Sequence, residues 1–106
     1  MSDQVQASHI LLMYEGSMRS SATRSKEEAQ QQIADLQQQI ADGGDFGALA
    51  KANSDCPSGS SGGDLGKFGK GQMVPEFDEA VFNLEVGASS GVVETPFGYH
   101  LIQRTG

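Results

Sequence analysis

The chain has 106 residues, which is the length of one domain. Its 37% hydrophobic residues, together with 14 glycines, come close to the apolar fraction of a globular protein, and this composition argues against general disorder. With 7 basic and 14 acidic residues, the formal net charge is −7, which argues against general nucleic-acid binding and against a partner on an anionic membrane surface. No apolar run in the sequence is long enough to span a bilayer, and the first residues lack the profile of a signal peptide. The single cysteine, Cys56, cannot form an internal disulfide. We therefore expect a single cytoplasmic domain over residues 1–106.

The first predicted element is a strand over residues 5–13. Its second half is apolar on both faces, which is typical of a central strand covered on both sides. After a polar loop, the spacing of Ser25 and Glu28 fits a capping box and predicts a helix that runs to about Asp42. The apolar stripe of this helix consists of Ala29, Ile33, Leu36 and Ile40.

Shorter elements and glycine-rich turns follow. Asp45 can cap a second helix over 46–53, and a loop rich in glycine and serine leads to a brief extended segment over 64–68. Pro75 suits the first turn of a third helix that ends near Gly87, and two closing strands are predicted over 92–94 and 99–104. Because helices and strands do not alternate strictly, this order predicts an α+β fold with a small, mostly antiparallel sheet.

Both histidines of the sequence, His9 and His100, lie within predicted strands among apolar residues. Each taken alone is more typical of a hydrogen-bonded core histidine than of a catalyst. If their strands are adjacent, the two rings could share a hydrogen bond. Such a pair would tend to stay neutral, because two like charges disfavour each other.

Cys56 precedes Pro57 in the loop between the second helix and the extended segment. It is either a small, partly buried side chain or a thiol whose reactivity depends on its pKa. The sequence disfavours a cysteine–histidine hydrolase, because no local protease signature accompanies the cysteine. It also disfavours a metal site of Cys56 and the two histidines, because the ligand spacing is not characteristic of one.

The glycine-rich segment 62–71 lacks the ending of a P-loop and the spacing of a dinucleotide fingerprint. Its glycines either form tight turns around a short strand or let the backbone of a bound peptide approach closely. Four nearby residues could form an apolar pocket, although the pattern alone favours a core position for each. They are Leu65, Met73, Phe77 and Phe97.

Five short blocks of the sequence form a specific, ordered set. They read ASHILL at 7–12, NSDCPS at 53–58, GGDLGKF at 62–68, GQMVPEF at 71–77 and TPFGYHLI at 95–102. Each block is weak alone, but together, in this order, they strongly resemble the parvulins, a family of peptidyl-prolyl cis/trans isomerases, and the resemblance covers essentially the whole chain. The resemblance implies a four-stranded antiparallel sheet wrapped by helices, in the order β-α3-β-α-β2.

The resemblance also implies roles for individual residues. His9 and His100 would be the paired histidines of the active site, and Cys56 would lie beside the bond that rotates. Leu65, Met73 and Phe77 would form the proline pocket. The rim of this pocket would hold Gln72, Thr95 and Phe97, with Thr95 counted among the catalytic residues. No metal, nucleotide or other cofactor is expected, and no covalent intermediate is required.

The implied activity is faster isomerisation of Xaa-Pro bonds in peptides and in unfolded or partly folded proteins, by a monomer. Two alternatives stay open: a noncatalytic module that binds proline peptides as a chaperone, and a Pin-type isomerase directed to phosphorylated Ser/Thr-Pro. Pin-type members grip the phosphate with a basic cluster after the first strand. Here that strand ends at Met13, and the loop offers Arg19 and Arg24 beside Glu15. We therefore expect an isomerase without strict phospho-specificity.

Overall fold

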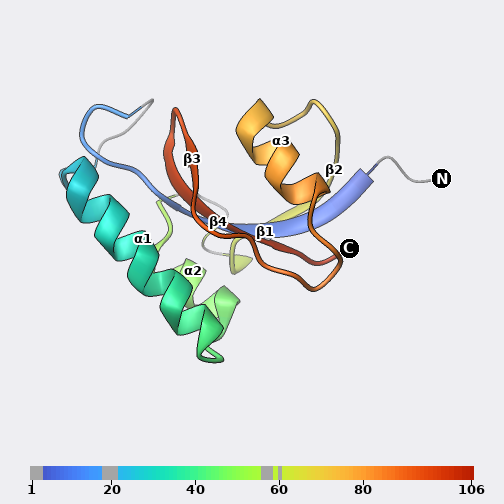
Figure 1. Ribbon diagram of the computed structural model, residues 1–106, viewed down its shortest axis with the longest axis horizontal. Coiled ribbons are helices and arrows are strands. Elements are labelled where there is room, and N and C mark those ends of the chain that lie inside the picture. Colours follow the sequence, from blue (N-terminus) through green and yellow to red (C-terminus); the bar gives the residue numbers. More distant parts are fainter. Residues whose placement is uncertain (1–3, 18–21, 56–58, 60) are drawn as a thin grey trace.

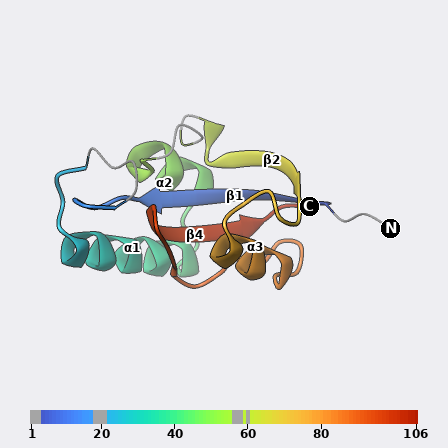
Figure 2. The ribbon, with the colours of Figure 1, turned by 90° about the horizontal axis from the view of Figure 1, so that it is seen from above.

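A four-stranded antiparallel sheet forms the centre of the computed structural model, which describes residues 4–17, 22–55, 59 and 61–106 (Figure 1). The strand order is β2-β1-β4-β3. The strands are β1 (Gln4–Leu12), β2 (Asp64–Gly69), β3 (Val93–Thr95) and β4 (Gly98–Arg104). Figure 2 shows β1 lying between β2 and β4. This central place explains why the second half of β1 is apolar on both faces.

The register between β1 and β4 decides which side chains share a face. Leu11 lies opposite His100, and His9 lies opposite Ile102. Since alternate residues of a strand point to opposite faces, His9 and His100 lie diagonally on the same face of the sheet. The two histidines are therefore neighbours although 91 residues separate them in the chain.

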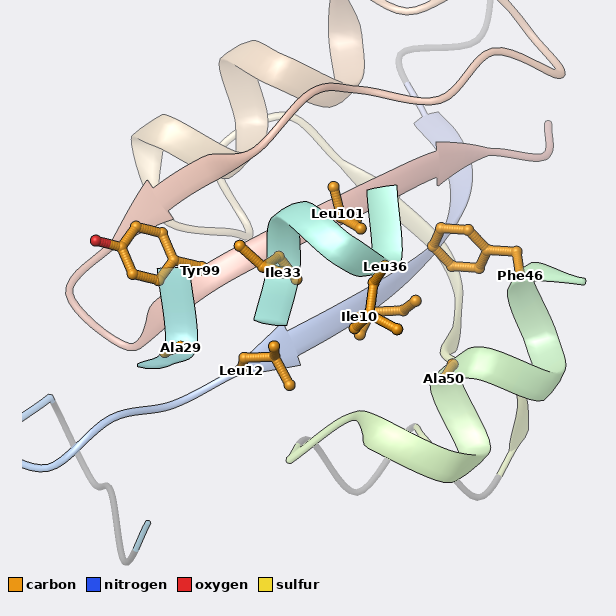
Figure 3. Packing of buried hydrophobic residues seen from close by; sticks show 9 residues of the cluster. All are labelled: Ile10, Leu12, Ala29, Ile33, Leu36, Phe46, Ala50, Tyr99 and Leu101. Carbon is orange, nitrogen blue, oxygen red and sulfur yellow. The ribbon is translucent and has the colours of Figure 1, made fainter. Parts of the chain in front are cut away.

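Helices α1 (Lys26–Ala41) and α2 (Phe46–Asn53) cover one face of the sheet (Figure 1). The predicted capping box of α1 is confirmed: Ser25 Oγ accepts from the Glu28 amide, and Glu28 Oε1 accepts from the Ser25 amide. Asp45 caps α2 by accepting a hydrogen bond from the amide of Gly47. Figure 3 shows the core beneath the two helices, which consists of Ile10, Leu12, Ala29, Ile33, Leu36, Phe46, Ala50, Tyr99 and Leu101.

Helix α3 (Pro75–Phe82) covers the opposite face (Figure 1). The two histidines lie on this face, because Phe77 of α3 contacts both rings. The core cluster of α3 consists of Val5, Ala7, Phe68, Phe77, Val81 and Ile102. The predicted end of this helix near Gly87 is wrong, because α3 stops at Phe82. The chain turns there so that backbone amides of Gly87 and Ser90 donate to carbonyl groups of β4. A continued helix would have left those carbonyl groups without these partners.

The described residues contain three helices, and none of them is long and apolar enough to cross a membrane. The parvulin resemblance implies a further short helix between α2 and β2. Part of that segment, residues 56–58 and 60, lies outside the described residues.

Candidate active site

The two histidines face each other beneath α3, because their strands are adjacent, the condition that the sequence left open. Nδ1 of His9 and Nδ1 of His100 are 3.2 Å apart, and the rings stack with centroids 5.3 Å apart. The side chains are almost fully buried, with exposed fractions of 5% for His9 and 4% for His100. Because only one proton can lie between two ring nitrogens at this distance, one ring donates to the other.

Thr95 extends this polar contact at the end of β3. Its Oγ1 lies 2.7 Å from Nε2 of His100 and accepts a hydrogen bond from the backbone amide of Phe97. The Thr95 side chain is buried, and the short β3–β4 turn brings it over the first residues of β4. A continuous chain of hydrogen bonds therefore runs from the amide of Phe97 through Thr95 and His100 to His9.

Burial keeps both histidines neutral. Loss of solvation lowers the pKa of His9 to about 4. For His100, burial together with the nearby His9 lowers the pKa to about 3. At neutral pH both rings are uncharged, in agreement with the neutral pair predicted from the sequence, so they act as hydrogen-bonding dipoles.

Phe77 joins the polar pair to the apolar cluster of α3. Its ring meets both imidazoles edge to face, with each pair of centroids 5.5 Å apart. Phe77 is 3% exposed, whereas Leu65, Met73 and Phe97 are only partly buried. Leu65 and Met73 pack against the same cluster. Of the four predicted pocket residues, Phe77 thus has the least surface to offer a ligand, and the other three have more.

Gln72 lies in the turn between β2 and α3, and its side chain is exposed. Its Oε1 accepts from the amide of Gly69 at 3.0 Å, so the carbonyl end of the side chain is engaged within the turn. Asp78 was not singled out by the sequence analysis, yet it is buried and accepts a hydrogen bond from Gly71 in this turn. No sequence signal marked it, because an acidic residue in the first turn of a helix is ordinarily solvated.

Cys56 lies outside the described residues, but the chain is attached to β1 on both sides of it. Before it, the amide of Asp55 donates to the carbonyl of Leu11 at 2.7 Å. After it, the carbonyl of Gly63 accepts from the amide of His9 at 2.9 Å. Asp55 and Gly63, which flank Cys56 in the sequence, therefore both lie beside the strand that carries His9.

The loop after β1 contributes one described arginine, and Arg19 lies outside the described residues. Arg24 forms an ion pair with Asp55 and donates to the carbonyl of Met13 at 2.8 Å. A hollow of about 320 Å³ adjoins this ion pair. The described residues contain no group of three or more side chains that could hold a metal ion.

The family model described as the PPIC-type PPIase domain matches residues 1–106. The peptidyl-prolyl cis-trans isomerase Pin1 of Digitalis lanata is 41% identical over 116 residues, which cover 99% of this chain and 98% of that protein. The chaperone SurA of Burkholderia lata is 43% identical over 100 residues, but these make up only 21% of its length.

Two solved structures have the same fold. The peptidyl-prolyl isomerase ESS1 from Candida albicans superposes with a TM-score of 0.95 at 40% identity, over 98% of this chain and 63% of that one. The solution structure of TbPIN1 superposes with a TM-score of 0.90 at 36% identity, over the full length of both chains.

Proposed function

The chain belongs to the parvulins, the PPIC-type peptidyl-prolyl cis/trans isomerases, and we propose that residues 1–106 form one catalytic domain whose active centre is the buried histidine pair with its apolar surroundings. The reaction is rotation about the bond that precedes proline. From the structure we assign the residues that hold the proline and those that set the polarity around the carbonyl group before it.

Rotation about a peptide bond is slow because the C–N bond has partial double-bond character, with a barrier of roughly 18–20 kcal/mol. No covalent bond is broken, so a catalyst needs only to bind the twisted form better than either planar form. We assign the prolyl ring to Leu65 and Met73, whose partly buried side chains pack on the α3 cluster. Holding the ring there lets the residues before it turn.

Polarity around the carbonyl group decides how much the planar form is stabilised. The planar form has charge separation, so removing water and polar partners from the carbonyl favours the twisted form. The neutral histidine pair suits this role, because a charged imidazolium would attract the negative carbonyl oxygen and stabilise the planar form. The observation that supports this proposal most directly is the position of Phe77, whose ring contacts both imidazoles edge to face. These contacts join the apolar cluster and the polar pair into one site.

The hydrogen-bond chain also leads us to assign the tautomers. The amide of Phe97 donates a hydrogen bond to Thr95 Oγ1, and the hydroxyl of Thr95 in turn donates to Nε2 of His100. In that arrangement His100 carries its proton on Nδ1 and donates to Nδ1 of His9. His9 then carries its own proton on Nε2, a nitrogen with no partner among the described residues.

The test of the pocket is the exchange rate of Xaa-Pro peptides measured by NMR, which needs no coupled protease. Replacing Met73 by Ala opens the pocket and is expected to lower kcat/KM about tenfold, because roughly 1–2 kcal/mol of apolar contact is lost. Met73→Leu keeps the volume and is the matched control, with activity near that of the wild type. An unchanged exchange rate in a folded Met73→Ala variant would remove Met73 from the pocket.

We propose that Cys56 acts through its polarity and not as a nucleophile. Cys56→Asp is then expected to keep isomerase activity, since a carboxylate can fill a polar position but cannot act as a thiol. Cys56→Ala serves as the comparison without a polar group. Loss of activity in a Cys56→Asp protein with a wild-type circular dichroism spectrum contradicts this role.

We further propose that the enzyme accepts uncharged residues before proline. A phosphate requires converging basic groups, whereas Arg24 already pairs with Asp55 and the strand ends at Met13. The Pin-type alternative is the second candidate, because several relatives are named Pin1. Peptides with alanine, glutamate, serine or phosphoserine before proline separate the two.

A kcat/KM for alanine within about tenfold of that for phosphoserine supports broad acceptance, and a preference above about a hundredfold for phosphoserine supports the Pin-type alternative. Asp55→Asn is the informative variant, because it frees Arg24 and should shift preference toward phosphoserine. Its neutral amide still accepts from the backbone amide of Met13, which Asp55 holds at 2.8 Å.

The chaperone relative supports unfolded or partly folded proteins as substrates, and we propose a cytoplasmic monomer without nucleic-acid or membrane partners. The charge of −7 and the single cysteine support this assignment. Light scattering after size exclusion tests the monomer. Faster refolding of a protein whose slow phase is proline isomerisation tests the substrate class.

A further inference from the structure

We propose that Asp78 is a positioning residue: its buried carboxylate holds the turn between β2 and α3 and so places Gln72 and Met73 for substrate binding. The inference rests on the proposed function, since it assumes that these two residues meet the substrate. It adds a residue that lies outside the pocket and acts on it through the backbone.

The contact joins the first turn of α3 to the preceding turn. Oδ2 of Asp78 accepts a hydrogen bond from the backbone amide of Gly71, with 2.5 Å between oxygen and nitrogen. Gly71 has a φ of +92°, a left-handed backbone conformation that glycine adopts most readily. Asp78 is 6% exposed, so the contact is shielded from water.

The turn is closed by its own hydrogen bonds but oriented by Asp78. The amide of Gln72 donates to the carbonyl of Gly69, and the Gln72 side chain accepts from the amide of Gly69. These bonds lie within the turn and cannot fix its angle to α3. The Asp78–Gly71 hydrogen bond fixes the angle between the turn and α3. Asp78 directly follows Phe77, whose ring contacts both histidines. One turn of helix therefore places the loop relative to the histidine pair.

Packing holds the end of the turn but not its first residues. Met73 and Val74 pack against the α3 cluster, whereas Lys70, Gly71 and Gln72 are exposed. A hollow of about 360 Å³ adjoins Asp78 and is lined also by Lys70 and Phe82, so the first residues of the turn are the part that the Asp78 hydrogen bond holds. Lys70 lies with its ammonium 6.0 Å from the Phe82 ring, and the described residues contain no ion pair between Lys70 and Asp78.

A buried carboxylate is a costly way to stabilise a fold. Removing a charged group from water is unfavourable unless its oxygens find partners, and Oδ1 of Asp78 has none among the described residues. An apolar side chain at this position would avoid that cost but could not accept from the amide of Gly71. The position of the turn is thus what the carboxylate supplies.

The test compares Asp78→Ala, Asp78→Asn and the matched control Glu79→Ala, which removes an exposed carboxylate from the next residue of the same helix. Asp78→Ala is expected to raise KM for an Ala-Pro peptide about five- to tenfold with kcat within twofold, because one hydrogen bond is lost. Asp78→Asn keeps an acceptor oxygen and should stay within about twofold of wild type, like Glu79→Ala.

The second readout is hydrogen exchange of the Gly71 amide, followed by NMR without any substrate. Exchange should be about tenfold faster in Asp78→Ala and protected in Asp78→Asn. If the alanine variant does not fold, Asp78→Ser takes its place. The serine side chain is one bond shorter than that of aspartate, so its hydroxyl should not reach the Gly71 amide and exchange should again be faster than in wild type.

Two results would overturn the proposal: KM and Gly71 exchange in Asp78→Ala equal to those in Glu79→Ala, or a loss of activity that Asp78→Asn does not restore. The exchange measurement separates this proposal from the assignment of the pocket. Faster Gly71 exchange with an unchanged KM means that Asp78 holds the turn but the turn does not serve the substrate, which also overturns the positioning role. An unchanged rate in Met73→Ala, by contrast, removes Met73 from the pocket and leaves the exchange result for Gly71 as it is.

Discussion

Mild acid should destabilise this protein through its two histidines. His9 and His100 have an ordinary pKa of 6.5 when the chain is unfolded, but pKa values of about 4 and about 3 in the folded protein. Between these limits the unfolded chain binds protons that the folded protein does not. The stability that the pair contributes is therefore present above pH 6.5 and falls as the pH is lowered, down to about pH 4 for His9 and about pH 3 for His100.

The size of the effect follows from the two shifts. A difference of one pKa unit corresponds to about 1.4 kcal/mol, so each histidine contributes a slope that approaches this value per pH unit below pH 6.5. Between pH 7.5 and pH 5.5 the pair together should remove about 3 kcal/mol of the free energy of unfolding. That loss is a large part of the 5–15 kcal/mol typical of a domain.

Urea unfolding followed by far-UV circular dichroism measures the effect, since the sequence has no tryptophan for a fluorescence signal. The interval from pH 7.5 to pH 5.5 isolates the histidines, because most carboxylates titrate below it. His9→Asn is the control variant. Its amide can occupy the place of Nδ1, and with one titrating ring left the slope should be halved.

A change smaller than about 1 kcal/mol over this interval would refute the reasoning, since at least one ring would then have an unshifted pKa. An equal slope in wild type and His9→Asn would refute it as well, because the loss would have another source. A loss of isomerase activity at pH 5.5 without unfolding would place the titration in the folded state.

Three further predictions concern single contacts. Gly63→Ala would put a Cβ 2.3 Å from the backbone oxygen of His9, so the urea midpoint of this variant should fall strongly. The control is Gly66→Ala, because Gly66 has a similar positive φ but open space around it, and this variant is expected to cost about 1 kcal/mol. Equal effects of the two substitutions would contradict the clash. Ser25→Ala should lower the free energy of unfolding by about 1 kcal/mol through loss of the helix cap, while Ser25→Thr retains most of it. Thr95→Val should lower the free energy of unfolding by about 1–3 kcal/mol, because it leaves a buried imidazole nitrogen without its partner, and Thr95→Ser should restore it.

Local chemistry made most of the secondary structure predictable. The capping box of Ser25 and Glu28, the cap at Asp45 and the place of Pro75 are contacts within a few residues, so a short sequence window contains all the partners. The end of α3 was mispredicted for the opposite reason. Apolar residues at helical spacing continue to Leu84, but the helix ends at Phe82 because the amides of Gly87 and Ser90, farther along the chain, pair with carbonyl groups of β4.

The site was predictable in part. The ordered sequence blocks placed His9 and His100 together through resemblance to a family, and the strand register brings the two rings into contact. That Phe77 is buried against both rings, and that Arg24 is engaged by Asp55, depends on contacts between segments far apart in the chain.

What the sequence by itself determined is therefore the set of elements, their order and the family, since caps, periodicity and motif blocks are local or ordered along the chain. Only the tertiary structure decided that burial is the main cause of the neutrality of the histidine pair, and that Asp78 is buried. Both depend on the loss of water around a side chain. That loss is set by everything that packs against it, from β1, β4 and α3 together.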